Sequence, residues 1–336
     1  MTLEPSHWLR ATLLGFGLVT ASHVAQAQSA PADSAAIWSF QDENASLSPS
    51  RVTDRYYVNG LRLGYASPEG DVPAPLARLA GALWDGGAVR LTVGLSQQIY
   101  TPDATGLAVP PSQDHPYAGV LLGTVGLVRD GADSRSTLGL SLGLVGPDAL
   151  AEQVQNGFHD IIEQGHTNGW RYQIHDEPLV ELTAGRTWRL PAGQLGAVET
   201  DVLPDVAAGL GNERIYGQTG VVLRFGQGLA SDYGAPRVSP GPSVGDVFKP
   251  TRPLVWYVFA GVDAQVVGRD IALNGNNFRD SASVTPYPLM GEAEAGFAII
   301  AWGTRLTYTQ VVQTKEFAYQ RGGLHQLGSL ALSMRF

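Results

Sequence analysis

The sequence predicts an all-β protein: a transmembrane, antiparallel up-and-down β-barrel of about twelve strands, with a short helix in one long loop. Three observations support this prediction. Apolar residues make up 44% of the 336 residues, yet they are spread over alternating positions rather than gathered in long blocks. Alternation with period two is typical of a strand that has one apolar and one polar face. Many of the alternating segments have the length of about 9–11 residues that a tilted membrane-spanning strand requires.

The predicted strands follow one another without a second domain or an internal repeat. They are residues 37–43, 56–66, 89–98, 118–128, 137–145, 178–190, 195–207, 215–226, 254–268, 287–301, 303–313 and 327–336. Trp302 and Gly303 leave almost no loop between the tenth and eleventh strands, whereas several gaps are long: 67–88, 99–117, 146–177, 227–253 and 269–286. Short turns at one end and long loops at the other are the asymmetry of outer-membrane barrels.

The N-terminal residues 1–27 are typical of a secretory signal peptide. Arg10 precedes an apolar run, and Ala25-Gln26-Ala27 forms an A-x-A cleavage pattern. The apolar run is too short for a membrane-spanning helix. We therefore expect the barrel to occupy residues 28–336.

The C-terminal end alternates strictly, with Leu330, Leu332, Met334 and Phe336 on one face. A last strand with lipid outside and a polar interior has this pattern. It also resembles the C-terminal signal of bacterial outer-membrane barrels, which implies that the barrel assembly machinery is a partner through the strand ending at Phe336. The alternative is a secreted, soluble β-sandwich.

Composition excludes some classes of function. The chain has no cysteine, so neither disulfides nor thiolate metal sites can contribute. Its formal net charge of −9 argues against nucleic acid as a partner, because such partners call for a basic surface.

Residues 146–159 predict the short helix. Pro147 suits a first helical turn, and helix-forming residues follow it. From Gln155 one turn reaches His159 and a second reaches Glu163, because residues four apart share a face. An amide, an imidazole and a carboxylate in a row could perform acid–base chemistry. The alternative is a solvated helix in a surface loop.

Polar clusters stand where the predicted strands meet their loops. Strands that are neighbours in sequence are also neighbours in an up-and-down barrel, so the clusters could converge on one sector of the wall. Each alone could instead be turn chemistry or an interfacial aromatic anchor. The clusters are residues 41–44, 53–60, 98–102, 114–119, 155–163, 169–170 and 177–178.

The order of these motifs resembles the LpxR-type lipid A 3′-O-deacylases of Gram-negative outer membranes. The motifs are D-E-N, T-D-R-Y-Y-x-N-G, Q-x-Y-T-P, D-H-P-Y-A-G, V-G-P…E-Q-V-Q-N-x-x-H, G-W and H-D-E-P, and residues 210–212 and 232–236 resemble later blocks. The resemblance covers nearly the whole mature chain. It implies a twelve-stranded outer-membrane barrel that hydrolyses the 3′-linked acyl chains of lipid A, has lipopolysaccharide as its partner and depends on calcium.

The resemblance also implies roles for single residues. His159 matches the family's catalytic histidine, Gln155 the glutamine one turn before it, and Asn44 the asparagine of an N-D pair near the end of the first strand. The chain departs from the family at Ala45, where an aspartate that is a calcium ligand is usual, and at Val58, where threonine is common.

The missing carboxylate would have to be supplied by Asp42, Glu43 or Glu163. Asp42 and Glu43 are adjacent strand positions that face opposite sides, so only one of them can reach His159, and alternation alone does not choose between them. The residues expected to contact substrate are Asn156, Asp54, Arg55, Asn59 and Tyr100.

The expected chemistry is ester hydrolysis by activated water. No Gly-x-Ser-x-Gly motif occurs, so a serine elbow is not indicated. His159 could deprotonate water while a hard cation polarises the carbonyl. His166 and His175 lack the helical spacing and are interpreted as loop residues. The alternatives are a barrel that has lost the activity and keeps a structural or lipopolysaccharide-binding role, an outer-membrane phospholipase, and a passive pore.

Overall fold

The structure is a computed structural model, and it describes residues 32–49, 55–237 and 246–336. The chain divides into a unit of residues 1–31 and a unit of residues 32–336, of which the second is described below. The predicted signal peptide 1–27 and the predicted substrate contact Asp54 lie outside the described residues.

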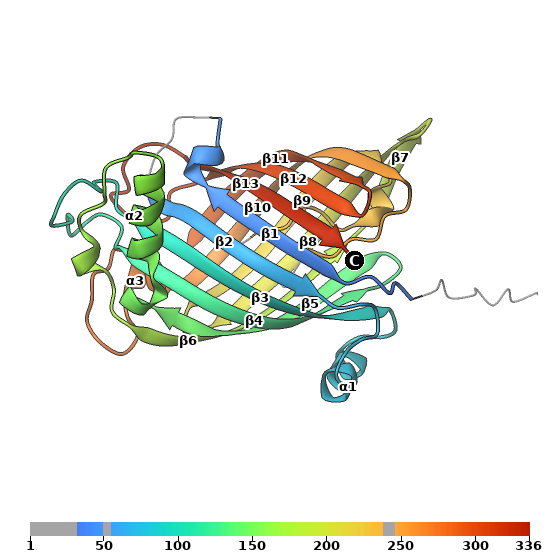
Figure 1. The fold of residues 1–336 in the computed structure, drawn as a ribbon, viewed down its shortest axis with the longest axis horizontal. Coiled ribbons are helices and arrows are strands. Elements are labelled where there is room, and N and C mark those ends of the chain that lie inside the picture. The colour runs from blue at the N-terminus through green and yellow to red at the C-terminus, as the bar shows by residue number, and fades with distance from the viewer. Residues whose placement is uncertain (1–31, 50–54, 238–245) are drawn as a thin grey trace, which may run out of the picture. The chain divides into compact units, whose positions relative to one another are not determined.

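Residues 32–336 form a closed antiparallel β-barrel (Figure 1). Its strands are β1 (Ile37–Asn44), β2 (Tyr56–Ala66), β3 (Ala88–Thr101), β4 (Ala118–Asp130), β5 (Ser134–Val145), β6 (Glu177–Trp188), β7 (Leu190–Leu195), β8 (Val198–Gly211), β9 (Arg214–Gln227), β10 (Leu254–Asp270), β11 (Leu289–Ala301), β12 (Thr304–Gln313) and β13 (His325–Arg335). Pairing of β1 with β13 and of β6 with β8 closes the ring. Because β7 continues β6 past Arg189, the described strands fill twelve positions, and the predicted fold class is confirmed.

Two expectations about connections need correction. Leu195 was expected to open the seventh strand, but it ends β7, and the turn follows at Gly196 with φ of 62°. Long loops were expected at one end only. The long connections 67–87 and 228–253 instead lie at the same end as the short turns 131–133 and 302–303 and the chain's last residue.

Side chains alternate across the wall as the sequence pattern predicts. Large apolar side chains are exposed on the outer face, as a barrel surrounded by lipid requires. This outer belt includes Trp38, Phe40, Leu63, Val93, Leu95, Val125, Leu140, Leu142, Val180, Leu182, Val221, Leu223, Phe225, Val258, Val262, Phe297, Ile299, Leu330, Leu332 and Met334. Ser329 and Ser333 of the last strand face inward and are buried, so the alternation expected there is confirmed.

The segment between β9 and β10, here called the lumen segment (residues 228–237 and 246–253), packs against the inner face of the barrel wall. Its Asp232 binds the Arg224 guanidinium at 2.5 Å and the Tyr257 hydroxyl at 2.9 Å. Asp246 binds Arg305 from β12. These charges are almost fully buried and satisfy one another, which is the condition for stable burial of ions.

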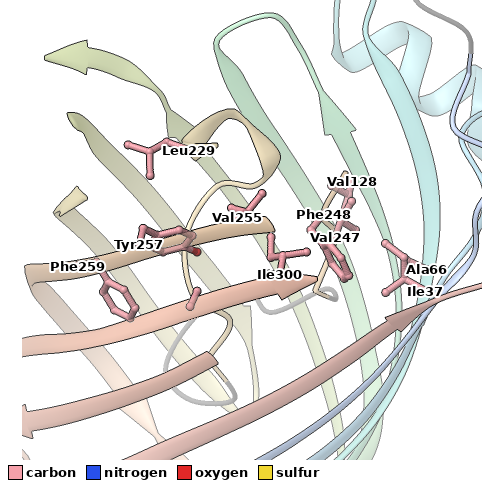
Figure 2. Close-up of a cluster of buried hydrophobic side chains, with 11 residues drawn as sticks. Ile37, Ala66, Val128, Leu229, Val247, Phe248, Val255, Tyr257, Phe259 and Ile300 are labelled. Carbon is pink, nitrogen blue, oxygen red and sulfur yellow. The ribbon is translucent and has the colours of Figure 1, made fainter. Parts of the chain in front are cut away.

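Apolar contacts hold the same segment against the wall. Val247 and Phe248 pack among inward-facing side chains such as Ile37, Val128 and Ile300 (Figure 2). The lumen segment therefore occupies part of the barrel interior, beside a cavity of about 200 Å³ that is lined by inward-facing polar residues such as Arg135, Asp205 and Glu294.

The helices are short. They are α1 (Ala74–Leu83), α2 (Ala151–Ile161) and α3 (Ile271–Asn274), with the 3₁₀ turns η1 (Ala45–Leu47), η2 (Pro147–Ala149), η3 (Trp170–Tyr172) and η4 (Leu229–Ser231). Within the described ranges, no helix is long and apolar enough to cross a membrane. Figure 1 shows α2 lying across β2, β3 and β4 at the end opposite α1.

Replacing Arg224 with methionine should destabilise the barrel strongly. The change keeps most of the side-chain volume but leaves the buried carboxylates of Asp201 and Asp232 without their guanidinium partner. Breaking a buried pair in this way costs about 3–5 kcal/mol. The temperature at which the folded band converts to the unfolded band in a gel should fall well below that of the parent. The exposed Arg279→Met is the control, and equal conversion temperatures for both variants would contradict this account of the lumen.

Candidate functional site

A pocket of about 150 Å³ lies between α2 and the adjoining ends of β1, β2 and β3. Its lining residues are Asp42, Asn44, Ala45, Ser46, Val58, Asn59, Leu61, Ile99, Val154, Gln155, Phe158, His159, Ile162 and Gln164. Asp42 and Asn44 follow Trp38 and Phe40 on the outward face of β1. The pocket therefore lies on the lipid side of the wall, and α2 covers it from outside.

The position of α2 follows from a small residue on the wall. Leu150 takes a left-handed conformation with φ of 62° and turns the chain from η2 into α2. A Cβ added at Gly119 of β4 would lie 2.5 Å from the Cβ of Ala151. Only glycine there lets the first turn of α2 approach so closely. The Gln97 side chain also donates to the Ala149 carbonyl at 2.6 Å.

The predicted face of α2 is formed by Ala151, Gln155 and His159, which are its buried residues. The Gln155 side-chain oxygen accepts from the Trp170 indole at 3.1 Å and from the Thr167 hydroxyl at 3.1 Å. An indole N–H can only donate, so the oxygen end of Gln155 must face Trp170. The amide nitrogen is then the end of this side chain that donates hydrogen bonds elsewhere.

A backbone carbonyl orients the His159 imidazole. Its Nδ1 lies 2.9 Å from the Gly165 carbonyl oxygen, which can only accept a hydrogen bond. The proton of the neutral ring is therefore on Nδ1, and Nε2 carries the lone pair. The imidazole is 5% exposed, so the surrounding residues fix its position. A ring oriented in this way presents Nε2 as the nitrogen that can accept a proton.

The strands supply the opposite wall of the pocket. The Asn59 amide donates to Asp42 Oδ1 at 2.8 Å and to the Glu43 carbonyl at 3.2 Å. Asn44 accepts from the Ser46 backbone N–H at 2.7 Å and caps η1, so its side-chain nitrogen is the end directed elsewhere. A bulge in β2 shifts the register between Tyr57 and Asn59 and brings Val58 to the pocket as well.

The structure places two predicted site residues on the other side of the wall. Glu43 faces the lumen, where it accepts from the Tyr57 hydroxyl at 2.9 Å and pairs with Arg237 of the lumen segment at 3.0 Å. Tyr100 also faces inward and stacks on the His115 ring at 5.5 Å. Of the two adjacent carboxylates that the sequence left open, Asp42 is the one at the pocket.

Three more predicted residues are outside the pocket lining. The helical face was expected to continue to Glu163, but α2 ends at Ile161, and Glu163 has φ of 56° and is exposed. Arg55 pairs with Asp103 at 2.8 Å. Asn156 accepts from the Thr167 backbone at 3.0 Å and holds the loop that follows the helix.

The residues present fit a calcium ion poorly. In the parts of the chain that the structure describes, no group of three or more His, Cys, Asp or Glu side chains could hold a metal. Among the described residues that line the pocket, Asp42 is the one carboxylate, and Ala45 offers no side-chain oxygen. Calcium takes six to eight oxygen ligands, usually with several carboxylates among them.

Sequence reasoning missed Thr167, which bonds both Gln155 and the Trp170 indole at the back of the helix. It also missed the role of Gly119 as the seat of α2. Thr167 lies in a loop with no periodic pattern. The sequence did indicate a cluster at residues 114–119. The reason for a glycine at position 119 is the close packing of α2 on it, which the sequence alone does not reveal.

Gly119→Val should lift α2 from the wall and expose its amides, because the added side chain overlaps Ala151. Hydrogen–deuterium exchange over residues 151–161 should then speed up markedly. Gly123→Val is the matched control, since the nearest atom to a Cβ at this outward position on the same strand is 3.7 Å away. Equal protection of α2 in both variants would show that Gly119 does not position the helix.

The fold is similar to that of a solved structure. The solved structure titled "LpxR from Salmonella typhimurium" has 21% sequence identity and a TM-score of 0.73, over 89% of this chain and 100% of that chain. The β domain of the Bordetella autotransporter BrkA has 10% identity and a TM-score of 0.45, over 91% of this chain and 100% of that one. No curated protein matches the chain.

The sequence itself matches the family described as "Outer membrane protein LpxR" over residues 13–336, nearly its whole length. A match of that extent, together with the closed twelve-position barrel and its apolar outer belt, places the protein in the outer membrane. The chain belongs to the LpxR family of outer-membrane proteins.

Proposed function

We propose that the protein hydrolyses the 3′-linked acyl esters of lipid A in the outer leaflet, with the pocket beneath α2 as its active site. Family membership supports the activity. The observation that carries the site is His159, held as the Nδ1–H tautomer in a pocket on the lipid side of the wall. Lipid A lies in the membrane, so a site facing lipid suits it better than one inside the barrel.

The chemistry follows from the groups that line the pocket. His159 Nε2 takes a proton from water, and the water oxygen attacks the ester carbonyl carbon while the C=O electron pair moves to oxygen. The amide nitrogens of Gln155 and Asn44 donate hydrogen bonds to that developing oxyanion. On collapse the bond to the sugar oxygen breaks, and the imidazolium returns its proton to the leaving alkoxide. A fatty acid and a free hydroxyl are released, and His159 is neutral again.

The apolar part of the lining suits an acyl chain. Leu61 and Ile99 come from the wall, and Phe158 and Ile162 come from α2 and its end. Phe158 and Ile162 are about half exposed, so they extend the outer belt to the edge of the pocket. An acyl chain can enter from the bilayer along this surface without crossing water, which keeps the burial of apolar area favourable throughout.

The resemblance to the LpxR-type deacylases implies a dependence on calcium, but the steps above require no metal ion. When bound, the ion would polarise the ester carbonyl. Asp42 and the side-chain oxygens beside it in the pocket would be its ligands, but these oxygens are fewer than the six to eight ligands that calcium usually takes.

His159→Ala should abolish acyl release while the barrel stays folded. Loss of a general base lowers the rate by about 10²–10⁴-fold. Mass spectrometry of lipid A from cells expressing each variant should show full acylation for His159→Ala. His166→Ala is the matched control, because this exposed loop histidine pairs with Asp160 away from the pocket. Deacylation by His159→Ala at the parental rate would contradict the assigned base.

Ala45→Asp should raise calcium affinity. It places a second carboxylate in the pocket beside Asp42, and added charge strengthens calcium binding. Titration calorimetry of the purified barrels should show tighter calcium binding for Ala45→Asp than for the parent. Glu163→Gln should change nothing, since that residue is exposed outside the lining. If Glu163→Gln lowered the calcium affinity by more than Ala45→Asp raised it, the metal ligands would lie elsewhere.

The second candidate is a barrel that has lost the activity and binds lipopolysaccharide. Ala45 favours it, because the resemblance implies a calcium-ligating aspartate at this position, and Asp42 is the one carboxylate among the described lining residues. Incubation of the purified protein with lipid A and with phospholipid, each with and without a chelator, separates the candidates. Binding of lipid A without acyl release, in both conditions, would support the second candidate over the first.

A further inference from the structure

Helix α1 lies on the outer face of the barrel wall. Along β4, Val125 is exposed to the outside, and Leu127, two residues on, points the same way. Yet Leu127 is 3% exposed, as is Ala80 in the middle of α1, and α1 contacts β4. The helix therefore covers Leu127 from the lipid side, and Figure 1 shows it beside the strands rather than within them.

Hydrogen bonds fix the C-terminal end of α1 to the same strand. The Arg129 guanidinium, also on the outward face of β4, donates to the Gly86 carbonyl at 2.8 Å and to the Asp85 carbonyl at 2.6 Å. At the other end of the connection, Asp33 and Glu69 exchange hydrogen bonds at 2.7 and 2.9 Å. The helix is thus held in a defined place although only Ala80 of its residues is buried.

The rest of α1 presents an apolar face with no protein partner. Leu79 and Leu83, four residues apart, share a face and are 41% and 51% exposed. Gly81 and Arg78 lie on the opposite side, and Arg78 is the helix's single charge. An amphipathic helix of this kind lies in the plane of a membrane interface.

The level of α1 along the wall matches such an interface. Helix α2 packs on Gly119 of β4, and α1 packs on Leu127 of the same strand. Eight residues of strand span about 26 Å, or about 20 Å along the axis of a tilted barrel strand. The apolar band of outer-membrane barrels is about 25 Å tall. These two positions are therefore separated by slightly less than the height of that band, which places α1 near its boundary at the end that carries the short turns.

We propose that α1 is an interfacial anchor that binds phospholipid of the periplasmic leaflet. Leu79 and Leu83 insert among acyl chains, and Arg78 reaches the phosphate of the headgroups. Val125, exposed on the same outward face of β4 as Leu127, belongs to the outer belt beside which α1 lies. By holding one end of β4 at the inner boundary, α1 sets the depth at which α2 meets the outer leaflet. This inference rests on the barrel and its membrane, and not on the proposed hydrolysis.

Nitroxide labels on single cysteines test this directly, because the chain has no cysteine of its own. The variants are Leu79→Cys, Leu83→Cys and, as the control on the opposite face, Gly81→Cys, where a Cβ meets nothing within 4 Å. The full mature barrel is reconstituted in vesicles of phosphatidylethanolamine and phosphatidylglycerol. Power-saturation spectroscopy then compares collisions with oxygen, which concentrates in lipid, and with a water-soluble nickel chelate present on both sides.

The ratio of oxygen to nickel collisions should be several-fold higher at positions 79 and 83 than at position 81. Equal, water-like ratios at all three positions would overturn the proposal, because α1 would then lie in the aqueous phase. A gel shift on heating confirms that each labelled barrel is folded. Should Leu83→Cys fail to fold, Leu79→Cys on the same face decides the outcome alone.

Discussion

Closure of the sheet in lipid is the constraint on which the rest of this structure depends. Because β1 pairs with β13 and β6 with β8, strand backbone groups are satisfied around the ring, and side chains must alternate between lipid and lumen. Asp42 and Asn44 occupy outward positions that would face hydrocarbon if the strand were bare. They are tolerated because they lie at the end of the wall, beneath α2.

The same alternation separates two kinds of carboxylate. Asp42 faces the pocket, whereas its neighbour Glu43 faces the lumen and pairs with Arg237. The lumen segment holds the interior together through apolar contacts and paired charges such as Arg224 with Asp232, whereas the polar groups beside His159 lie on the outside of the wall. The covering helix gives those groups shelter from lipid and an apolar edge at Phe158 along which an acyl chain can arrive.

Local periodicity was sufficient to predict the strands, the apolar outer face and the helical spacing of Gln155 and His159, since each depends on neighbours in sequence. The end of α2 at Ile161 was not predictable, because no helix-breaking residue stands there. Glu163 itself takes a left-handed conformation and therefore leaves the helical face. The choice between Asp42 and Glu43 depends on Arg237, almost two hundred residues away. The burial of Val247 and Phe248 in the lumen is likewise a long-range contact that residues 228–253 do not indicate alone.

Photo-crosslinking to lipid A tests the central claim, that substrate meets the protein on the lipid side beneath α2. A benzophenone amino acid replaces Phe158 at the pocket, Phe259 in the lumen, or the exposed Phe278 in the loop after α3. In native outer membranes, irradiation should attach lipid A acyl chains at position 158 well above the level at 278, and none at 259. Attachment at 259 with none at 158 would contradict the account, because the substrate would then enter the barrel rather than the pocket on its wall.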